Sequence, residues 1–324
     1  MHKRHIQAVC VAAAVGLCGS GSAVGAVPES DESIKIVTNN WTSQVVQSHI
    51  AATLLQDMGY STEMVPTNTE LQWPALEDGE VNLQMEVWEG INREQFNEGV
   101  EAGTILDVGQ HDATTREEWW YPAHVEEQCP GLPDWQALND CAEIFATPET
   151  YPSGRYLGGP VEWNKGDHAL VEALDLDFKV INAGSASALW AELDAAVRAE
   201  EPIVMFFWKP NWAASAYEGS FVEFPANEEA CNDDPEWGPN PDVTGDCGNP
   251  YPAWLKKAMS PNADEQWPCA VELVRNMNFS DAEVNEMSRL VDQEDLDYEE
   301  AAEKWIEDNA EQVESWQPEC ATSA

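Results

Sequence analysis

The hydrophobic pattern of the chain predicts several buried strands, and three of them run into a tryptophan. They lie within residues 33–41, 81–88 and 202–208, and the last is a continuous apolar run bounded by prolines. Such a run is typical of a strand in a parallel sheet covered by helices. Ligands of open α/β sheets bind at the carboxyl ends of the strands, so the terminal tryptophans mark a candidate binding site. These residues are Trp41, Trp88 and Trp208.

Segments with helical spacing separate the predicted strands. The first begins near Thr42 or Ser43, either of which can cap it, and places Val46, Ile50 and Leu54 on one face. Further helices are expected around residues 71–77, 92–101, 168–174 and 187–200. The C-terminal part is also expected to be helical, because Ser280 with Glu283 and Asp297 with Glu300 have the spacing of capping boxes. This alternation predicts a parallel sheet with helices on both faces.

Changes in composition divide the chain into two predicted lobes. A polar stretch at 111–118 is expected to cross from the first lobe into the second, and the segment 212–221 is expected to cross back. We expect an α/β fold with two lobes, each a mainly parallel sheet flanked by helices. Lobe I comprises residues 27–115 plus 218–324, and lobe II comprises residues 116–217. Within lobe II, the glycine-rich stretch 153–160 predicts a turn.

The N-terminus has the pattern of an export signal. Residues 2–5 are basic, residues 8–17 are apolar, and small residues up to Ala26 offer cleavage sites. The apolar run is shorter than the roughly 20 residues that a membrane span needs. Lipidation at Cys18 is an alternative fate of this segment. We therefore predict a signal peptide at 1–26 and a periplasmic or otherwise extracytoplasmic protein.

The charge restricts the partners. Sixty acidic and fifteen basic residues give a formal net charge of -45. Such a surface repels nucleic acid and anionic lipid, so neither is expected to bind. Self-repulsion of this size is tolerated best where salt screens it, which indicates a saline environment.

Six cysteines remain after removal of the signal, and in an exported protein they predict disulfides. Six cysteines allow about fifteen pairings. Pairing in chain order is favoured, although the other pairings stay open. It gives Cys129–Cys141, Cys231–Cys247 and Cys269–Cys320. Zinc is the alternative, but the cysteines lack the short spacings that zinc motifs use.

No cofactor is predicted, and one structural metal is considered. The acidic loop 227–252 carries oxygen ligands of the type that Ca²⁺ prefers, although these acids do not match an EF-hand and a solvated acidic loop is the favoured explanation. These acids are Glu228, Glu229, Asp233, Asp234, Asp242 and Asp246. The histidines are scattered, and acid pairs such as Glu117–Glu118 carry no information in so acidic a chain.

The chain has fifteen tryptophans, and most are expected to be structural. Those at strand ends suit a different role, because indole faces attract a cation that has no N–H to donate, such as a trimethylammonium group. Stacking on a sugar is the competing use of such tryptophans.

Three motifs resemble the betaine-binding components of ABC importers. They are the W-x-P-x-W sequence at 208–212, the V-W-E sequence at 87–89, and the strand-to-Trp41 start at 34–41. The resemblance covers essentially the whole mature chain. The cysteine-bounded loop 231–247 and the G-G-P-V-E sequence at 158–162 are similar to the subgroup that includes trimethylamine-N-oxide binders.

This resemblance implies a two-lobed receptor that closes on a quaternary ammonium compound held in a tryptophan box. Trp41, Trp88, Trp120 and Trp208 match the box, and Tyr156 or Trp163 would supply a further wall. Glu162 would complement the cation or donate to an N-oxide, and the backbone of Gly158 and Gly159 would bind a ligand carboxylate. Arg155 and Lys209 are weaker candidates for that carboxylate.

The sequence as a whole predicts a monomeric receptor, not an enzyme, that delivers a small quaternary ammonium osmolyte to an ABC transporter permease. Glycine betaine is the first ligand considered, with trimethylamine N-oxide or dimethylsulfoniopropionate as alternatives. From other classes, the alternatives are an exported sugar-binding hydrolase and a choline-binding surface module.

Overall fold

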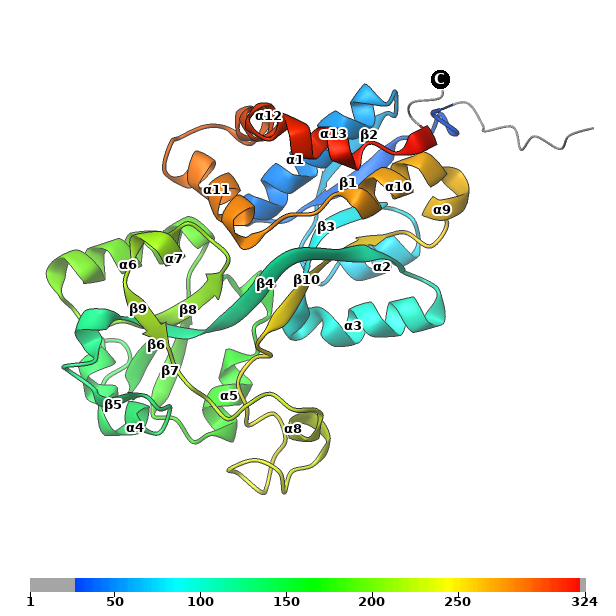
Figure 1. Cartoon of the computed structure of the whole chain (residues 1–324). Helices are drawn as coiled ribbons and strands as arrows, with labels where there is room; N and C mark the ends of the chain where they lie inside the picture. Colours follow the sequence, from blue (N-terminus) through cyan, green and yellow to red (C-terminus); the bar gives the residue numbers. More distant parts are fainter. Residues whose placement is uncertain (1–26, 321–324) are drawn as a thin grey trace, which may run out of the picture.

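The computed structural model describes residues 27–320, and a nine-stranded mixed sheet runs through its centre (Figure 1). The predicted signal peptide and Cys18 lie outside the described residues. The strand order is β2-β1-β3-β10-β4-β8-β6-β7, with β9 paired to β4. The strands are β1 (Ile34–Thr38), β2 (Thr62–Pro66), β3 (Leu83–Trp88), β4 (Leu106–Pro122), β5 (Pro130–Pro133), β6 (Gly154–Gly158), β7 (Phe178–Asn182), β8 (Val204–Lys209), β9 (Gly219–Phe221) and β10 (Ala253–Met259).

Each half of the sheet has three parallel strands, which are β2, β1 and β3 in one half and β7, β6 and β8 in the other. Strands β4 and β10 lie between the two sets and run antiparallel to their neighbours. The prediction of an α/β fold with helices on both faces is confirmed. The parallel pairing holds within each set of three, and the strands that connect the halves run the other way.

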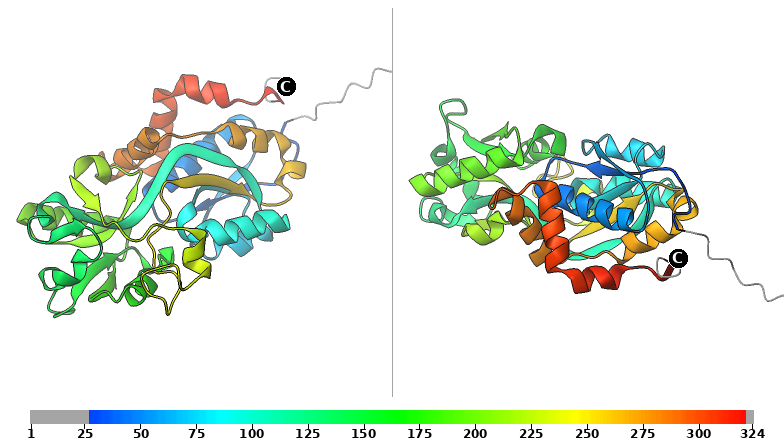
Figure 2. Two further views of the ribbon diagram at one scale, coloured as in Figure 1. Left: turned by 60° about the horizontal axis from the view of Figure 1, so that its bottom comes forward. Right: turned by 90° about the horizontal axis from the view of Figure 1, so that it is seen from above.

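Helices cover both faces of the first half (Figure 1). Helix α1 packs against α11 and α12 on one face, and Figure 2 shows the C-terminal helices lying over α1. The longer helices are α1 (Thr42–Asp57), α2 (Gln72–Glu77), α3 (Glu89–Ala102), α5 (Asp167–Ala173), α6 (Ala186–Ala199), α10 (Pro268–Asn276), α11 (Asp281–Asp292), α12 (Tyr298–Asp308) and α13 (Ala310–Trp316). The short ones are α4 (Ala137–Asp140), α7 (Ala213–Ala216), α8 (Glu229–Asp233) and α9 (Ala263–Gln266). Within residues 27–320, no helix is long and apolar enough to cross a membrane.

Strand β4 connects the halves, and its length was not predicted. It pairs with β10 up to Thr115 and with β8 from Arg116 onward. The stretch 111–118, expected to be a polar crossing, is therefore the middle of a strand. Its buried positions alternate as a strand requires, but polar residues such as His111 and Thr115 occupy them, which hides the pattern in the sequence.

The glycine-rich stretch 153–160 forms β6 instead of the expected turn. A Cβ atom on Gly154 would lie 2.5 Å from the ring of Phe178, so glycine is needed for these two parallel strands to pack. The glycines of this strand serve close packing within the sheet, which composition alone does not distinguish from a turn.

The chain returns to the first half later than expected. Strand β9 still pairs with β4 in the second half, and Asn240 donates to the Ala173 carbonyl at 2.7 Å. Only β10 re-enters the first half. We therefore propose that the second lobe extends toward Ala253 and does not end at residue 217.

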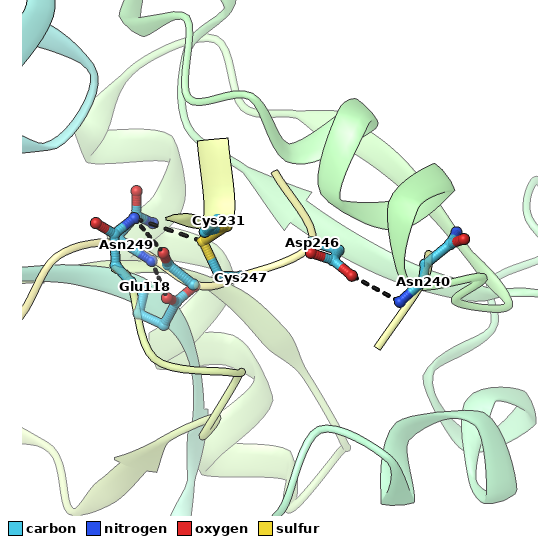
Figure 3. The surroundings of a disulfide bond; sticks show 8 residues. Glu118, Cys231, Asn240, Asp246, Cys247 and Asn249 are labelled. Atoms are coloured by element: carbon cyan, nitrogen blue, oxygen red, sulfur yellow. Dashed lines mark hydrogen bonds between the residues drawn. A yellow bond between two sulfur atoms is a disulfide. The ribbon is translucent and has the colours of Figure 1, made fainter. Parts of the chain in front are cut away.

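The three disulfides predicted from chain order are all present, namely Cys129–Cys141, Cys231–Cys247 and Cys269–Cys320. The second encloses the acidic loop (Figure 3). Next to it, the buried carboxylate of Glu118 accepts from the Asn249 backbone N–H at 2.8 Å and so attaches the loop to β4. Burial raises the pKa of Glu118 to about 7.

The acids of that loop do not gather into a metal site. Asp246 is buried and accepts from the Asn240 backbone N–H at 2.7 Å (Figure 3). Across residues 27–320, no group of three or more His, Cys, Asp or Glu side chains is arranged to hold a metal ion. The calcium hypothesis gains no support from this arrangement.

Candidate ligand-binding site

A cavity at the junction of the two halves brings together the three strand-end tryptophans. Trp41 and Trp88 occupy the positions just before α1 and α3, and Trp208 lies at the end of β8. The lining residues are Trp41, Thr69, Trp88, Asn92, Glu117, Trp163, Lys165, Phe206 and Trp208. Residues from both halves therefore enclose one largely aromatic space, as expected of a small-molecule site.

Trp163 is the central ring of this cavity. Its centroid lies 6.2 Å from that of Trp41 and 5.3 Å from that of Trp208, with interplanar angles of 87° and 90°. Phe206 packs on it at 5.8 Å. Because Trp41 and Trp208 lie perpendicular to Trp163, the indole faces around the cavity point in different directions. This arrangement suits a cation with methyl groups on several sides.

A buried carboxylate holds two of the indoles, and the sequence analysis missed it. The same oxygen of Glu86 accepts from the indole N–H of Trp41 at 2.6 Å and of Trp88 at 2.9 Å. Ser43 also donates to it, so this residue serves the site and does not cap α1. Burial raises the pKa of Glu86 to about 7, although these hydrogen bonds oppose the shift. The available signal was an acid inside a predicted buried strand, two residues before Trp88.

Glu117 and Lys165 form an ion pair on the cavity wall. The Lys165 ammonium also lies 5.1 Å from the centroid of Phe206. Gly90 lets the carboxylate approach α3, since a Cβ there would lie 2.6 Å from a Glu117 oxygen. The sequence does not distinguish Glu117 from the many other acids, and the structure places its side chain at the cavity.

Several predicted site residues lie in the core around the cavity instead of lining it. Trp120 stacks on Phe207 with centroids 4.5 Å apart, and Tyr156 stacks on Trp119 at 3.7 Å. Of the two candidates for the further wall, Trp163 is therefore the one that reaches the cavity.

Gly158 and Gly159, whose backbone was predicted to bind a ligand carboxylate, lie outside the cavity lining. Gly158 is the last residue of β6, and its carbonyl accepts from the Ala183 N–H at 2.9 Å. A Cβ on Gly159 would lie 2.6 Å from the Trp163 ring, so this glycine makes room for that indole. Neither glycine lines the cavity, and Arg155 pairs with Glu192 at 2.9 Å elsewhere on the second half.

Glu162 lies beside the cavity and joins the two halves. Its carboxylate accepts from the Asn40 side-chain amide at 2.6 Å, and its backbone carbonyl accepts from the Thr69 hydroxyl. The carbonyl oxygen of the Asn40 amide accepts from the Trp163 indole N–H at 2.5 Å. These contacts connect the loops after β1 and β2 to residues 161–163, so they stabilise the closed arrangement of the halves.

Replacing Asn40 with alanine is expected to weaken ligand binding about fivefold, because its two hydrogen bonds across the junction each contribute about 0.5 kcal/mol to the closed state. Calorimetry would measure the affinity, and stopped-flow fluorescence would locate the effect in the dissociation rate. Asn139→Ala is the matched control, since Asn139 also makes two hydrogen bonds but lies away from the junction. Equal affinities of the two variants would contradict a role of Asn40 in closure.

An aromatic cavity closed between two α/β halves defines the class, which is that of two-lobed solute-binding proteins. The chain belongs to one family within it, because residues 32–308 match the substrate-binding domain of ABC-type glycine betaine transport systems (OpuAC). The expected family is thereby confirmed.

Two curated relatives fit this assignment. The trimethylamine N-oxide-binding protein of Pelagibacter ubique (strain HTCC1062) is 37% identical over 289 residues, which are 87% of this chain and 89% of the relative. The glycine betaine/carnitine transport binding protein GbuC of Listeria monocytogenes is 26% identical over 143 residues, 44% of this chain and 41% of the relative.

Solved structures share the fold. A choline-binding protein of an ABC transporter, in complex with choline, has a TM-score of 0.71 at 18% identity and covers 89% of this chain and 92% of its own. Lactococcal OpuAC, closed on glycine betaine, has a TM-score of 0.67 at 16% identity and covers 89% of this chain and all of its own. At these identities the likeness concerns the fold alone.

Membership of the family decides the functional class. The protein is a substrate-binding receptor of an ABC transport system and not an enzyme, so the hydrolase and the surface-module alternatives are set aside. Substrate-binding proteins of this family are extracytoplasmic.

Proposed function

We propose that the protein binds a compact trimethylammonium zwitterion, trimethylamine N-oxide first, and delivers it to the permease of an ABC importer. The observation that carries the proposal is a single cavity walled by four indoles and one phenyl ring, with one ion pair on its wall. We further propose that the protein is exported by its first 26 residues and works as a monomer.

The aromatic walls suit the methylated end of the ligand. A trimethylammonium group cannot donate a hydrogen bond, so its binding depends on indole faces and on burial of its methyl groups. Trp88, Trp163 and Trp208 are nearly fully buried, which strengthens the attraction because little water screens it. The Glu117 carboxylate adds a negative charge on the same wall.

The ion pair suits the other end of a compact zwitterion. The Lys165 ammonium donates to an N-oxide oxygen, while Glu117 stays close to the positive nitrogen one bond away. The Pelagibacter relative, which is named for trimethylamine N-oxide, supports the same ligand.

Glycine betaine is the second candidate, because the cavity holds two donors that its carboxylate would need. Lys165 supplies an ammonium and Asn92 a side-chain amide. The betaine carboxylate extends farther from the nitrogen, so it places a negative charge nearer to Glu117, which disfavours it relative to the N-oxide.

Titration of the mature protein tests the proposal. Trimethylamine N-oxide, glycine betaine, proline betaine, choline and dimethylsulfoniopropionate would each be added, with tryptophan fluorescence and calorimetry as readouts. We expect saturable binding that is tightest for trimethylamine N-oxide. Binding of none of the five compounds would overturn the proposed ligand class.

Replacing Lys165 with methionine is expected to weaken binding of trimethylamine N-oxide about tenfold, since a hydrogen bond from a charged donor contributes about 1.5 kcal/mol or more. Methionine keeps an unbranched, flexible side chain and removes the ammonium. Calorimetry would measure the loss, and Lys179→Met on the exposed side of β7 is the control. An unchanged affinity would exclude Lys165 as the donor to the ligand oxygen.

A further inference from the structure

We propose that Glu86 is a positioning residue that orients two walls of the box and carries a proton-sensitive negative charge behind them, so that ligand binding releases a proton from Glu86. This inference rests on the proposed trimethylammonium ligand. Glu86 is not among the residues that line the cavity, and it acts through Trp41 and Trp88.

The carboxylate fixes the orientation of both indoles. Its one oxygen accepts from both ring N–H groups and from Ser43, at 2.6, 2.9 and 3.2 Å. Trp41 comes from the loop before α1 and Trp88 from the end of β3, so a single acceptor aligns rings from two elements. A donor-only group such as an indole N–H needs an acceptor when buried, and Glu86 serves two of them at once.

The other oxygen of Glu86 is where a proton can reside. It accepts from the Gln47 side-chain amide at 2.6 Å, and the Gln47 side-chain oxygen is buried without a hydrogen-bond partner in the described structure. Rotation of the Gln47 amide by half a turn would present that oxygen to Glu86. A protonated Glu86 then donates to Gln47 and still accepts from both indoles. Both charge states of Glu86 therefore keep the box intact.

Few other charges act on Glu86. On α1 its partners Ser43 and Gln47 do not titrate, and the nearest acid that α11 presents to this helix, Asp292, accepts from Thr42 and Trp212. Glu117 on β4 is paired with Lys165, which lies just before α5. On β10, Lys256 is paired with Asp107, and Lys257 donates to the Met277 carbonyl. At the start of α3, Glu89 is paired with Arg93. Burial is the main cause that raises the pKa of Glu86 to about 7.

The direction of the coupling follows from the charges. A cationic head against Trp41 and Trp88 stabilises the ionised carboxylate behind them, so binding lowers the pKa of Glu86. By linkage, the ionised protein binds the cation more tightly, and affinity falls as the pH drops through about 7. The proton that leaves Glu86 passes to the solvent and buffer.

The test measures affinity for trimethylamine N-oxide and for glycine betaine from about pH 6 to about pH 8.5, with wild type, Glu86→Gln and Glu118→Gln. We expect about a fivefold loss for wild type by pH 6, which is the effect at that pH if binding lowers the pKa of Glu86 from about 7 by about one unit. Glu86→Gln should bind at the low-pH level throughout, because glutamine keeps an acceptor for the indoles without the charge. Glu118→Gln removes a carboxyl of similarly raised pKa outside the cavity, so it should keep the wild-type dependence.

Calorimetry in buffers of different ionisation enthalpy would count the released proton, a readout that a purely structural role of Glu86 would not change. A ligand-free measurement separates the two proposals. The indole N–H resonances of Trp41 and Trp88, assigned with Trp41→Phe and Trp88→Phe, should titrate near pH 7 in wild type and not in Glu86→Gln.

Titrating indoles without binding of either probe would overturn the proposed ligand class and leave the proton site of Glu86 supported. Indole resonances that do not titrate, or a pH dependence that Glu86→Gln retains, would overturn the role of Glu86.

Discussion

Replacing Trp208 with alanine is expected to weaken binding of trimethylamine N-oxide at least about 30-fold, because a desolvated cation–π contact contributes about 2 kcal/mol. Trp208 is only 7% exposed and packs on Trp163 and Trp190, with centroids 5.3 and 4.7 Å apart. Loss of this ring removes one wall of the box and loosens its neighbours. Calorimetry at the pH of tightest binding would measure the effect.

Two further variants keep this prediction testable. A buried Trp→Ala change costs about 3–5 kcal/mol of stability, so thermal unfolding must show that the variant is folded. Trp208→Phe keeps an aromatic face and should lose only about fivefold in affinity. Trp120→Phe is the matched control, because Trp120 is also buried but stacks on Phe207 and does not line the cavity. Binding by Trp208→Ala within threefold of wild type, as measured by the same titration, would contradict the assigned role.

The free energy of unfolding is expected to fall as the pH rises from about 4.5 to about 7, because two buried carboxyls together outweigh one buried histidine. Burial lowers the pKa of His111 to about 3, so this residue opposes the fall below about pH 6.5. Burial raises the pKa of both Glu86 and Glu118 to about 7 in the folded protein. In the unfolded chain both ionise near their ordinary value. Each therefore stabilises the fold below that ordinary value and loses this contribution as the pH passes through about 7. The loss is of the order of 3 kcal/mol for each carboxyl.

Urea unfolding at a series of pH values would measure this dependence. Glu86→Gln and Glu118→Gln should each flatten the slope, and the double variant should flatten it most. The net charge of -45 also destabilises the fold as acids ionise, so the slope is compared with that of Glu63→Gln, an exposed acid on β2. A slope that the two buried variants share with wild type would contradict the prediction.

The parts of the fold that follow from local pattern were predicted well. The apolar run of β8 and the helical face of Val46, Ile50 and Leu54 on α1 are where the sequence indicates them. The capping boxes that begin α11 and α12 are also as their S-x-x-E and D-x-x-E patterns indicate. These features depend on neighbours a few residues apart, which the sequence displays directly.

The parts that were missed depend on polar residues in buried places. Strand β4 has a strand's alternation, but His111, Thr115 and Glu117 occupy its buried positions. The glycines of β6 have the composition of a turn, and only the ring of Phe178 across the sheet gives the reason for Gly154. Burial of a polar group is decided by partners far along the chain, such as Phe279, whose backbone N–H donates to the buried His111 imidazole from 168 residues away.

The sequence by itself determined the family, the alternation of strands and helices, and the convergence of Trp41, Trp88 and Trp208. Each of these follows from a local motif or from the rule that parallel strands end at one edge of a sheet. It favoured the disulfide pairing in chain order, which the structure then selected among the possible pairings. Only the tertiary structure decided that Trp163 and not Tyr156 faces the cavity, that Glu117 pairs with Lys165 there, and that Glu86 holds two indoles from behind. The physical reason is that a side chain's role depends on what surrounds it. In a chain with sixty acids, the three-dimensional packing determines which few carboxylates lose their water.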